Sequence, residues 1–265
     1  MPETIRLALS TVAFRPYVFV FLAVYLTAAL FKLGPRKTLL FTLSAWFLAY
    51  LSEFSSIRNG IPFGPYSYIP STAGRELWVW GVPFMDSLSF TFLVYASWGM
   101  ARVFLSPSTG KGLSFTLKES DSARRKGPHR FSWDVMLLGA LFVLMIDVVI
   151  DPLALRGDRW FLGRIYRYPV PGVYFGVTLA NFAGWFVVGL ATLTAWRMID
   201  KRMKGLFVMA GMPTLDLWAP ALYYMVLVFN LFMTFYIGEY ALAWAGVFMF
   251  LPVTALLILK LLRRT

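Results

Sequence analysis

The chain has 265 residues, of which 59% are hydrophobic and 14% are charged. Soluble domains carry about 25% charged residues, so this composition excludes a soluble globular domain and indicates an integral membrane protein. The sequence has no cysteine and a single histidine, which excludes disulfide frameworks and the Cys or multi-His sites of zinc and non-haem iron. We therefore expect no metal and no cofactor.

Hydropathy predicts an all-α bundle with about seven transmembrane helices, because a bilayer core needs about 20 apolar residues per helix. In chain order the expected helices cover residues 14–31, 38–54, 82–105, 133–151, 174–196, 217–236 and 240–259. Nothing between them is polar enough for a separate soluble domain. The whole chain, residues 1–265, is therefore predicted to form one transmembrane domain.

The basic residues predict the orientation of this bundle. The net charge of +12 lies in short loops between apolar segments, so we expect contacts with anionic lipid headgroups and no nucleic-acid partner. Eight of the 25 Lys and Arg residues fall on the side of the N-terminus and the other 17 on the opposite side. The positive-inside rule then places the basic loop 106–131 and the C-terminus in the cytoplasm of a multi-pass cell-membrane protein.

Polar residues within or next to the expected helices fall on one side of the membrane. In an alternating bundle all of them lie in the non-cytoplasmic half, where they can surround one cavity. They are Glu53, Asp86, Asp147, Asp151, Asn181, Asn230 and Glu239. Two loops on that side, 55–81 and 152–173, are rich in Pro, Gly, Tyr and Trp and are predicted to form a lid at headgroup depth.

Two of these carboxyls, Asp147 and Asp151, are four residues apart and so share one face of a helix. Asp151 precedes a proline and fits a residue facing interfacial water equally well. Asp147 lies about 6 Å deeper, at 1.5 Å rise per residue, which favours an interior partner or a functional role. Glu53 has Arg58 five residues away and also fits a plain ion pair.

Several motifs, in this order on a seven-helix chain, resemble a known family. They are Glu53, FGPY (63–66), IDVVIDP (146–152) and GVYFGVTLANFAGW (172–185). The pattern is similar to the membrane-bound carotenoid biosynthesis proteins of the carotenoid 1,2-hydratase type, also called CruF or bisanhydrobacterioruberin hydratases. The resemblance implies cofactor-free addition of water to the terminal C1=C2 double bond of an acyclic, lycopene-like carotenoid, which gives a tertiary alcohol.

The residues fit this reaction on physical grounds. Hydration of an alkene needs a protonated carboxylic acid and a carboxylate that orients or deprotonates water, and a close pair of carboxyls can divide these roles. We expect Asp147 to donate the proton, and Asp151, Glu53 or Asp86 to position the water. Aromatic faces would stabilise the cation and polar groups would orient its partners; the expected binding residues are Tyr174, Phe175, Asn181, Trp185, Tyr66 and Arg58.

Other functions fit parts of the same pattern. A carotenoid cyclase also protonates a terminal alkene but captures the cation with an internal double bond. A prenyltransferase would use the DxxxD spacing to hold Mg²⁺ and a diphosphate. A proton-coupled transporter would use the acids as a relay. The expected partners are an acyclic carotenoid, membrane lipids and other enzymes of the carotenoid pathway.

Overall fold

The computed structural model describes residues 3–117, 131–203 and 214–262. In this part of the chain the helices are α1 (Glu3–Phe14), α2 (Pro16–Leu33), α3 (Pro35–Asn59), α4 (Phe84–Leu105), α5 (Trp133–Ala154), α6 (Leu179–Arg202), α7 (Trp218–Tyr236) and α8 (Tyr240–Leu262). Short strands form three antiparallel pairs, β1 (Ser67–Tyr68) with β6 (Tyr166–Arg167), β2 (Trp78–Val79) with β3 (Val82–Pro83), and β4 (Ser108–Thr109) with β5 (Thr116–Leu117).

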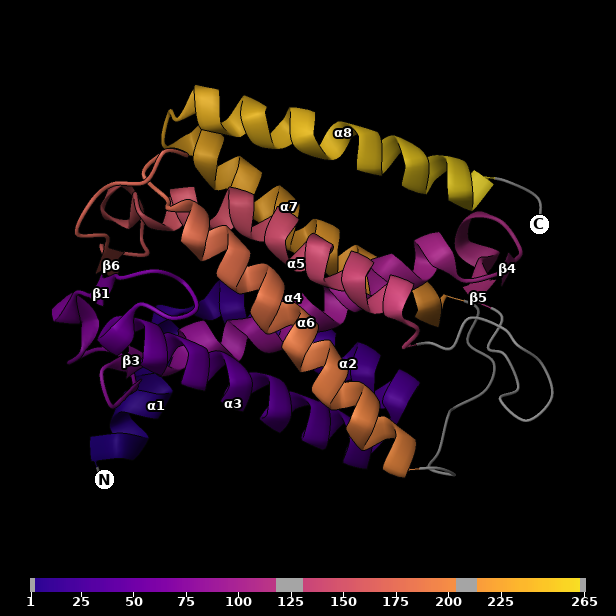
Figure 1. Ribbon diagram of the computed structural model, residues 1–265, viewed down its shortest axis with the longest axis horizontal. Helices are drawn as coiled ribbons and strands as arrows, with labels where there is room; N and C mark the ends of the chain where they lie inside the picture. Colours follow the sequence, from indigo (N-terminus) through magenta and orange to yellow (C-terminus); the bar gives the residue numbers. More distant parts are fainter. Residues whose placement is uncertain (1–2, 118–130, 204–213, 263–265) are drawn as a thin grey trace.

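The predicted all-α membrane bundle is confirmed. The segments 16–33, 35–59, 84–105, 133–154, 179–202, 215–236 and 240–262 are long and apolar enough to cross a membrane. The protein is therefore a multi-pass membrane protein. Its N- and C-termini lie at opposite ends of the bundle (Figure 1), as an odd number of spans requires.

Three predicted boundaries are wrong, each for a local reason. The helix breaks at Arg15, which has non-helical backbone dihedrals (φ −121°, ψ 51°) before Pro16, so α2 begins at Pro16 and the residues before it form a separate helix, α1. Helix α3 continues to Asn59 and ends at Gly60 in the left-handed conformation, so Glu53 lies inside the helix and not at its end. Helix α6 begins at Leu179, because the preceding apolar residues form a turn.

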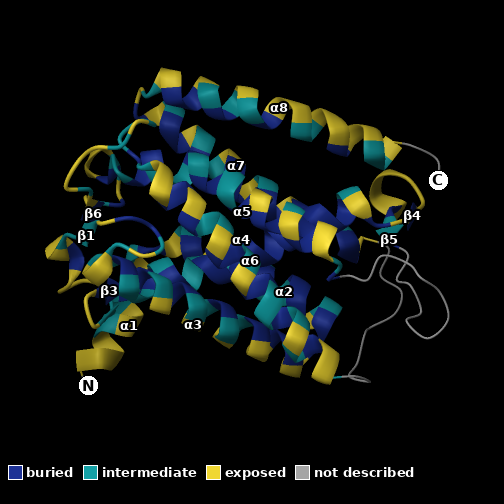
Figure 2. Cartoon of the chain, viewed as in Figure 1, coloured by how far each residue is buried: buried dark blue, intermediate teal, exposed yellow. Residues whose placement is uncertain are grey.

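Helix α4 forms the centre of the bundle. It packs against α3, α5 and α7. In its most apolar 18-residue segment 72% of the residues are buried, compared with 28% in that of α8. Figure 2 shows the contrast between the buried inner helices and the exposed surface of α8 and α1. Gly99 permits close packing of α4 on α7, because a Cβ there would lie 2.2 Å from Cβ of Ala219. Residues on α4 therefore face several helices at once.

The loops after α3 and α5 meet at the end of the bundle that carries the N-terminus, which we call the cavity end. Strands β1 and β6 pair there, with Tyr68 opposite Tyr166 (Figure 1). Arg15 fixes both loops: its guanidinium donates two hydrogen bonds to Glu76, at 2.8 and 3.0 Å, and one to the carbonyl of Leu162 at 2.9 Å. This end of the bundle is covered by ordered chain.

Of the predicted basic loop 106–131, residues 118–130 lie outside the described residues.

Candidate active site

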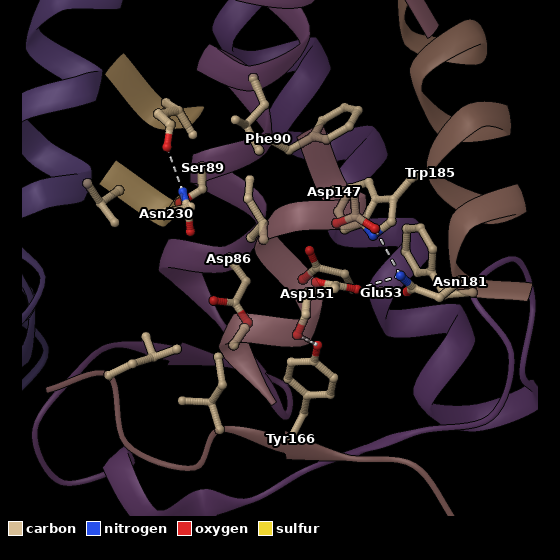
Figure 3. A pocket seen from close by; sticks show the side chains of 18 of the residues that line it. Glu53, Asp86, Ser89, Phe90, Asp147, Asp151, Tyr166, Asn181, Trp185 and Asn230 are labelled. Atoms are coloured by element: carbon tan, nitrogen blue, oxygen red, sulfur yellow. Dashed lines mark hydrogen bonds between the residues drawn. The ribbon is translucent and has the colours of Figure 1, made fainter. Parts of the chain in front are cut away.

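A cavity of about 160 Å³ lies beneath these loops, between the ends of α2 to α7. Its lining includes four carboxyl side chains together with many aromatic and aliphatic ones, and the acids are Glu53, Asp86, Asp147 and Asp151. They come from α3, α4 and α5, as the alternating arrangement of helices predicts. Figure 3 shows them directed towards a common space together with Asn181 and Trp185.

Asp147 and Asp151 are held together by one amide group. Nδ2 of Asn181 donates to Oδ2 of Asp147 at 3.0 Å and also donates to Oδ2 of Asp151. Asn181 itself is placed by the start of α6, where the side chain of Thr178 accepts its backbone N–H. Asp147 and Asn181 are only 6% and 4% exposed. The structure therefore brings two carboxyls side by side, away from bulk water, with a neutral donor between them.

Glu53 is positioned by neutral hydroxyl groups. Its Oε2 accepts hydrogen bonds from Oγ of Ser87 at 2.9 Å and from Oη of Tyr68 at 3.2 Å. Burial, followed by the nearby negative charge of Glu53, raises the pKa of Tyr68 well above its ordinary value, so this hydroxyl stays protonated and donates. Arg58 lies elsewhere, with its guanidinium 3.4 Å from the centre of the Phe54 ring. Glu53 is thus oriented by hydroxyls within the cavity.

Four tyrosines from the two loops cover the cavity, and all of them line it: Tyr66, Tyr68, Tyr166 and Tyr168. Their rings contact one another edge to face, with centroids 5.3 to 6.3 Å apart. The hydroxyl of Tyr166 donates to the backbone carbonyl of Asp151 at 3.1 Å, which joins the second loop to the end of α5. These rings separate the carboxyls from the surface.

Trp185 forms part of the cavity wall. Its ring centroid lies 4.5 Å from that of Phe63 and 5.3 Å from that of Phe90, on which it stacks. Gly184 allows this arrangement, since a Cβ there would lie 2.5 Å from Cδ1 of Phe63 and 2.9 Å from the carbonyl oxygen of Pro62. The FGPY segment therefore inserts against α6 at Gly184, and the aromatic faces approach the carboxyl pair (Figure 3).

Three of the expected binding residues lie outside the cavity lining. The Tyr174 ring packs on Phe182, and the Phe175 carbonyl accepts a hydrogen bond from Arg156 at 3.0 Å. Both belong to the turn before α6, where Phe175 has a positive φ of 48°. Arg58 stacks on Phe54 as described above. Hydropathy extended the helix through this apolar turn and so placed Tyr174 and Phe175 on the wrong kind of element.

Other lining residues were not predicted as part of the site. Ser89 and Phe90 follow Asp86 at helical spacings of three and four residues, so the face of α4 that carries Asp86 indicated them. Of the four tyrosines only Tyr66 was predicted; Tyr68, Tyr166 and Tyr168 were not, although both loops contain Tyr-x-Tyr, the alternation of a strand, at 66–68 and 166–168. Only the pairing of β1 with β6 brings these two segments together. Glu239, expected in the same half, lies outside the lining and pairs with Arg156 and Arg159.

These carboxyls do not form a metal site. Within residues 3–117, 131–203 and 214–262, no three His, Cys, Asp or Glu side chains are grouped so that they could hold an ion.

A protein-family model described as carotenoid biosynthesis protein matches residues 14–253. The chain belongs to this carotenoid biosynthesis family. The match spans α2 to α7 and most of α8, and includes every carboxyl of the cavity. Searches of curated proteins and of solved structures gave no match.

Proposed function

We propose that this carotenoid biosynthesis protein adds water to the terminal C1=C2 double bond of an acyclic, lycopene-like carotenoid and forms a tertiary alcohol. The observation that carries the proposal is the pair Asp147 and Asp151, which the amide of Asn181 holds together in a mostly apolar cavity. Family membership supports a carotenoid substrate. Carboxyls surrounded by apolar residues and neutral donors support acid–base chemistry at a hydrocarbon.

The size of the cavity supports a reaction at the end of a chain. At about 160 Å³ it is close to cavities of about 150 Å³ that bind one benzene molecule, so it holds about one isoprene unit of a polyene. The remainder of the substrate must leave the cavity into the hydrocarbon region. Apolar residues of α2, α4 and α7 line the cavity on the side away from the loops, among them Phe21, Phe92 and Val226. A long acyclic polyene fits this shape.

The chemistry proceeds in two steps that balance without a cofactor. The protonated carboxyl of Asp147 transfers its proton to C2, and the two electrons of the C1=C2 bond form the new C–H bond, which leaves a tertiary cation at C1. Ring faces of Trp185 and Phe90 stabilise this cation. Water then bonds to C1 and loses a proton to a carboxylate, for which Asp151, Glu53 and Asp86 are the candidates. The carboxyl group that took up this proton returns it to Asp147, directly or through Asp151, which restores the acid.

Expression in a lycopene-producing bacterial host, followed by mass spectrometry of the pigments, tests the proposal. We expect a gain equal to one water molecule per reacted end, lowered about 100-fold or more in Asp147→Asn and Asp151→Asn. Asp134→Asn is the matched control, because Asp134 lies exposed in the first turn of the same helix, far from the cavity.

Products other than the hydrated carotenoid would contradict the proposal and indicate another reaction. A pigment of unchanged mass with a shortened chromophore would indicate cyclisation, and a gain of a five-carbon unit would indicate prenyl transfer. Unchanged pigment across several acyclic carotenoids would remove the hydratase assignment and favour transport.

We also propose that the cavity end faces away from the cytoplasm of the cell membrane and that the C-terminus lies inside. The distribution of Lys and Arg supports this orientation. Because the chain has no cysteine, single cysteines test it: Val173→Cys at the cavity end, 83% exposed, and Leu113→Cys at the other end, 77% exposed. Labelling of position 173 alone by an impermeant thiol reagent is expected, and labelling of position 113 alone would invert the orientation.

A further inference from the structure

A second group of polar side chains lies on the wall of the cavity opposite Asn181. Asp86 and Ser89 are on one face of α4, and Asn230 is on α7. All three line the cavity that contains the aspartate pair. Figure 3 shows Asn230 and Ser89 on the side away from Asn181 and Trp185, with the carboxyls between the two groups. A substrate end group in the cavity would therefore have polar groups on two sides.

The hydrogen bonds of this group use donors of Asn230 and Ser89 within their own helices and leave side-chain oxygens of both residues as acceptors. Nδ2 of Asn230 donates to the carbonyl of Val226 at 2.8 Å, and Oγ of Ser89 donates to the carbonyl of Met85 at 2.8 Å. One of the two N–H hydrogens of Asn230 and the hydroxyl hydrogen of Ser89 are thus used within their own helices, and the second N–H of Asn230 remains a donor. The amide oxygen of Asn230 receives no hydrogen bond from any residue that the structure describes, although the side chain is only 7% exposed. An amide oxygen of such a little-exposed residue on the cavity wall favours a bound hydrogen-bond donor.

Asp86 adds a third acceptor, and it lies near the positive charge of Arg15. Burial opposes the charge of Arg15, but the hydrogen bond with Glu76 and nearby negative groups that include Asp86 raise the pKa of Arg15, which therefore stays a cation. Its guanidinium lies near the Asp86 carboxyl group, but no direct hydrogen bond between them is present, and its ion-pair partner is Glu76. The oxygens of Asp86, Ser89 and Asn230 line the cavity together, and any two of them are enough to accept the two hydrogens of one water molecule.

We propose that Asn230, with Ser89 and Asp86, binds the water molecule that captures the cation; this inference rests on the proposed hydration. A water that donates both hydrogens to acceptors on this wall directs a lone pair into the cavity, towards the end group. The acid pair protonates C2, and the bound water bonds to C1 and passes a proton to Asp86. A cation with no water in place returns a proton to a carboxylate and becomes an alkene again.

Deuterium labelling separates water capture from protonation. In D₂O each protonation puts one deuterium on the end group, and an uncaptured cation that loses a proton gives an unhydrated carotenoid carrying that deuterium. Membranes are supplied with an acyclic carotenoid, and mass spectrometry then measures the hydrated product and the recovered unhydrated carotenoid. The first gives the rate of hydration, and the deuterium in the second gives the rate of protonation without water capture. For Asn230→Leu we expect hydrated product to fall about tenfold or more, while deuterium in the recovered carotenoid persists or rises above that of the unaltered protein.

Further variants control for structural effects. Asn230→Asp restores acceptor oxygens and is expected to recover part of the hydration, and Ser89→Ala is expected to change the two rates in the same direction as Asn230→Leu, by less. Tyr224→Phe, which removes a hydroxyl of α7 bonded to Thr254 outside the cavity lining, should leave both rates unchanged.

Parallel loss of hydration and deuterium in Asn230→Leu would overturn the water site and give Asn230 a structural role. Unchanged hydration would overturn it as well. If the unaltered protein gave neither signal, the proposed hydration itself would be refuted.

Discussion

The buried ion pair between Arg15 and Glu76 is expected to hold the covering loops closed, and Glu76→Gln tests this. The two side chains are 3% and 0% exposed and share two hydrogen bonds. Removing one partner of such a pair leaves a buried charge uncompensated, at a cost of about 3–5 kcal/mol. At roughly 2–4 °C per kcal/mol, the melting temperature in detergent should fall by about 6–20 °C.

Two further measurements make this prediction specific. Trypsin should cleave the variant faster after the exposed residues Arg75 or Arg164, which lie in the loops that Arg15 joins, since local unfolding of these loops lets their backbone enter the protease active site. Glu3→Gln is the control, because the Glu3–Arg6 pair is 80% and 57% exposed and should contribute nothing measurable. Equal melting temperatures for the two variants, or a larger effect of Glu3→Gln, would refute the reasoning.

Three other substitutions are expected to separate parts of the site. Gly184→Val should push Phe63 out of the cavity, lower stability by about 1–3 kcal/mol and reduce product, as thermal melting and pigment analysis would show. Tyr68→Phe removes one of the two hydrogen bonds on Glu53, so stability should fall by about 1 kcal/mol and product should also fall. Arg58→Ala should leave the amount of product unchanged, because Arg58 stacks on Phe54 outside the cavity. A loss of product in this variant would show that Arg58 belongs to the site.

The sequence predicts the helices of this fold well because the bilayer imposes a length and an apolar composition on each of them. It also predicts that Asp147 and Asp151 share a helix face, since that depends only on local geometry. It does not predict contacts between distant segments. Arg15 with Glu76 and Tyr68 with Tyr166 are brought together by loops, and no local pattern encodes their pairing. Tyr174 was misplaced because apolar turns and apolar helices have the same hydropathy.

The buried acids of the protein are stabilised in two different ways. At the end opposite the cavity, Asp200 pairs with Lys37 at 2.8 Å and Asp216 with Lys32 at 2.9 Å. An adjacent cation favours the ionised form of a carboxyl and makes it a poor proton donor. In the described part of the chain, none of the ion pairs includes a carboxyl of the cavity.

The cavity acids instead receive their hydrogen bonds from neutral groups. Asn181 donates to Asp147 and Asp151, and Tyr68 and Ser87 donate to Glu53. Neutral donors orient a carboxyl without fixing its charge, so it can release and take up a proton within one reaction. A purely structural role would favour a cationic partner, as at the opposite end of the bundle. The choice of partners therefore supports, independently of family membership, the proposed proton transfer in the cavity.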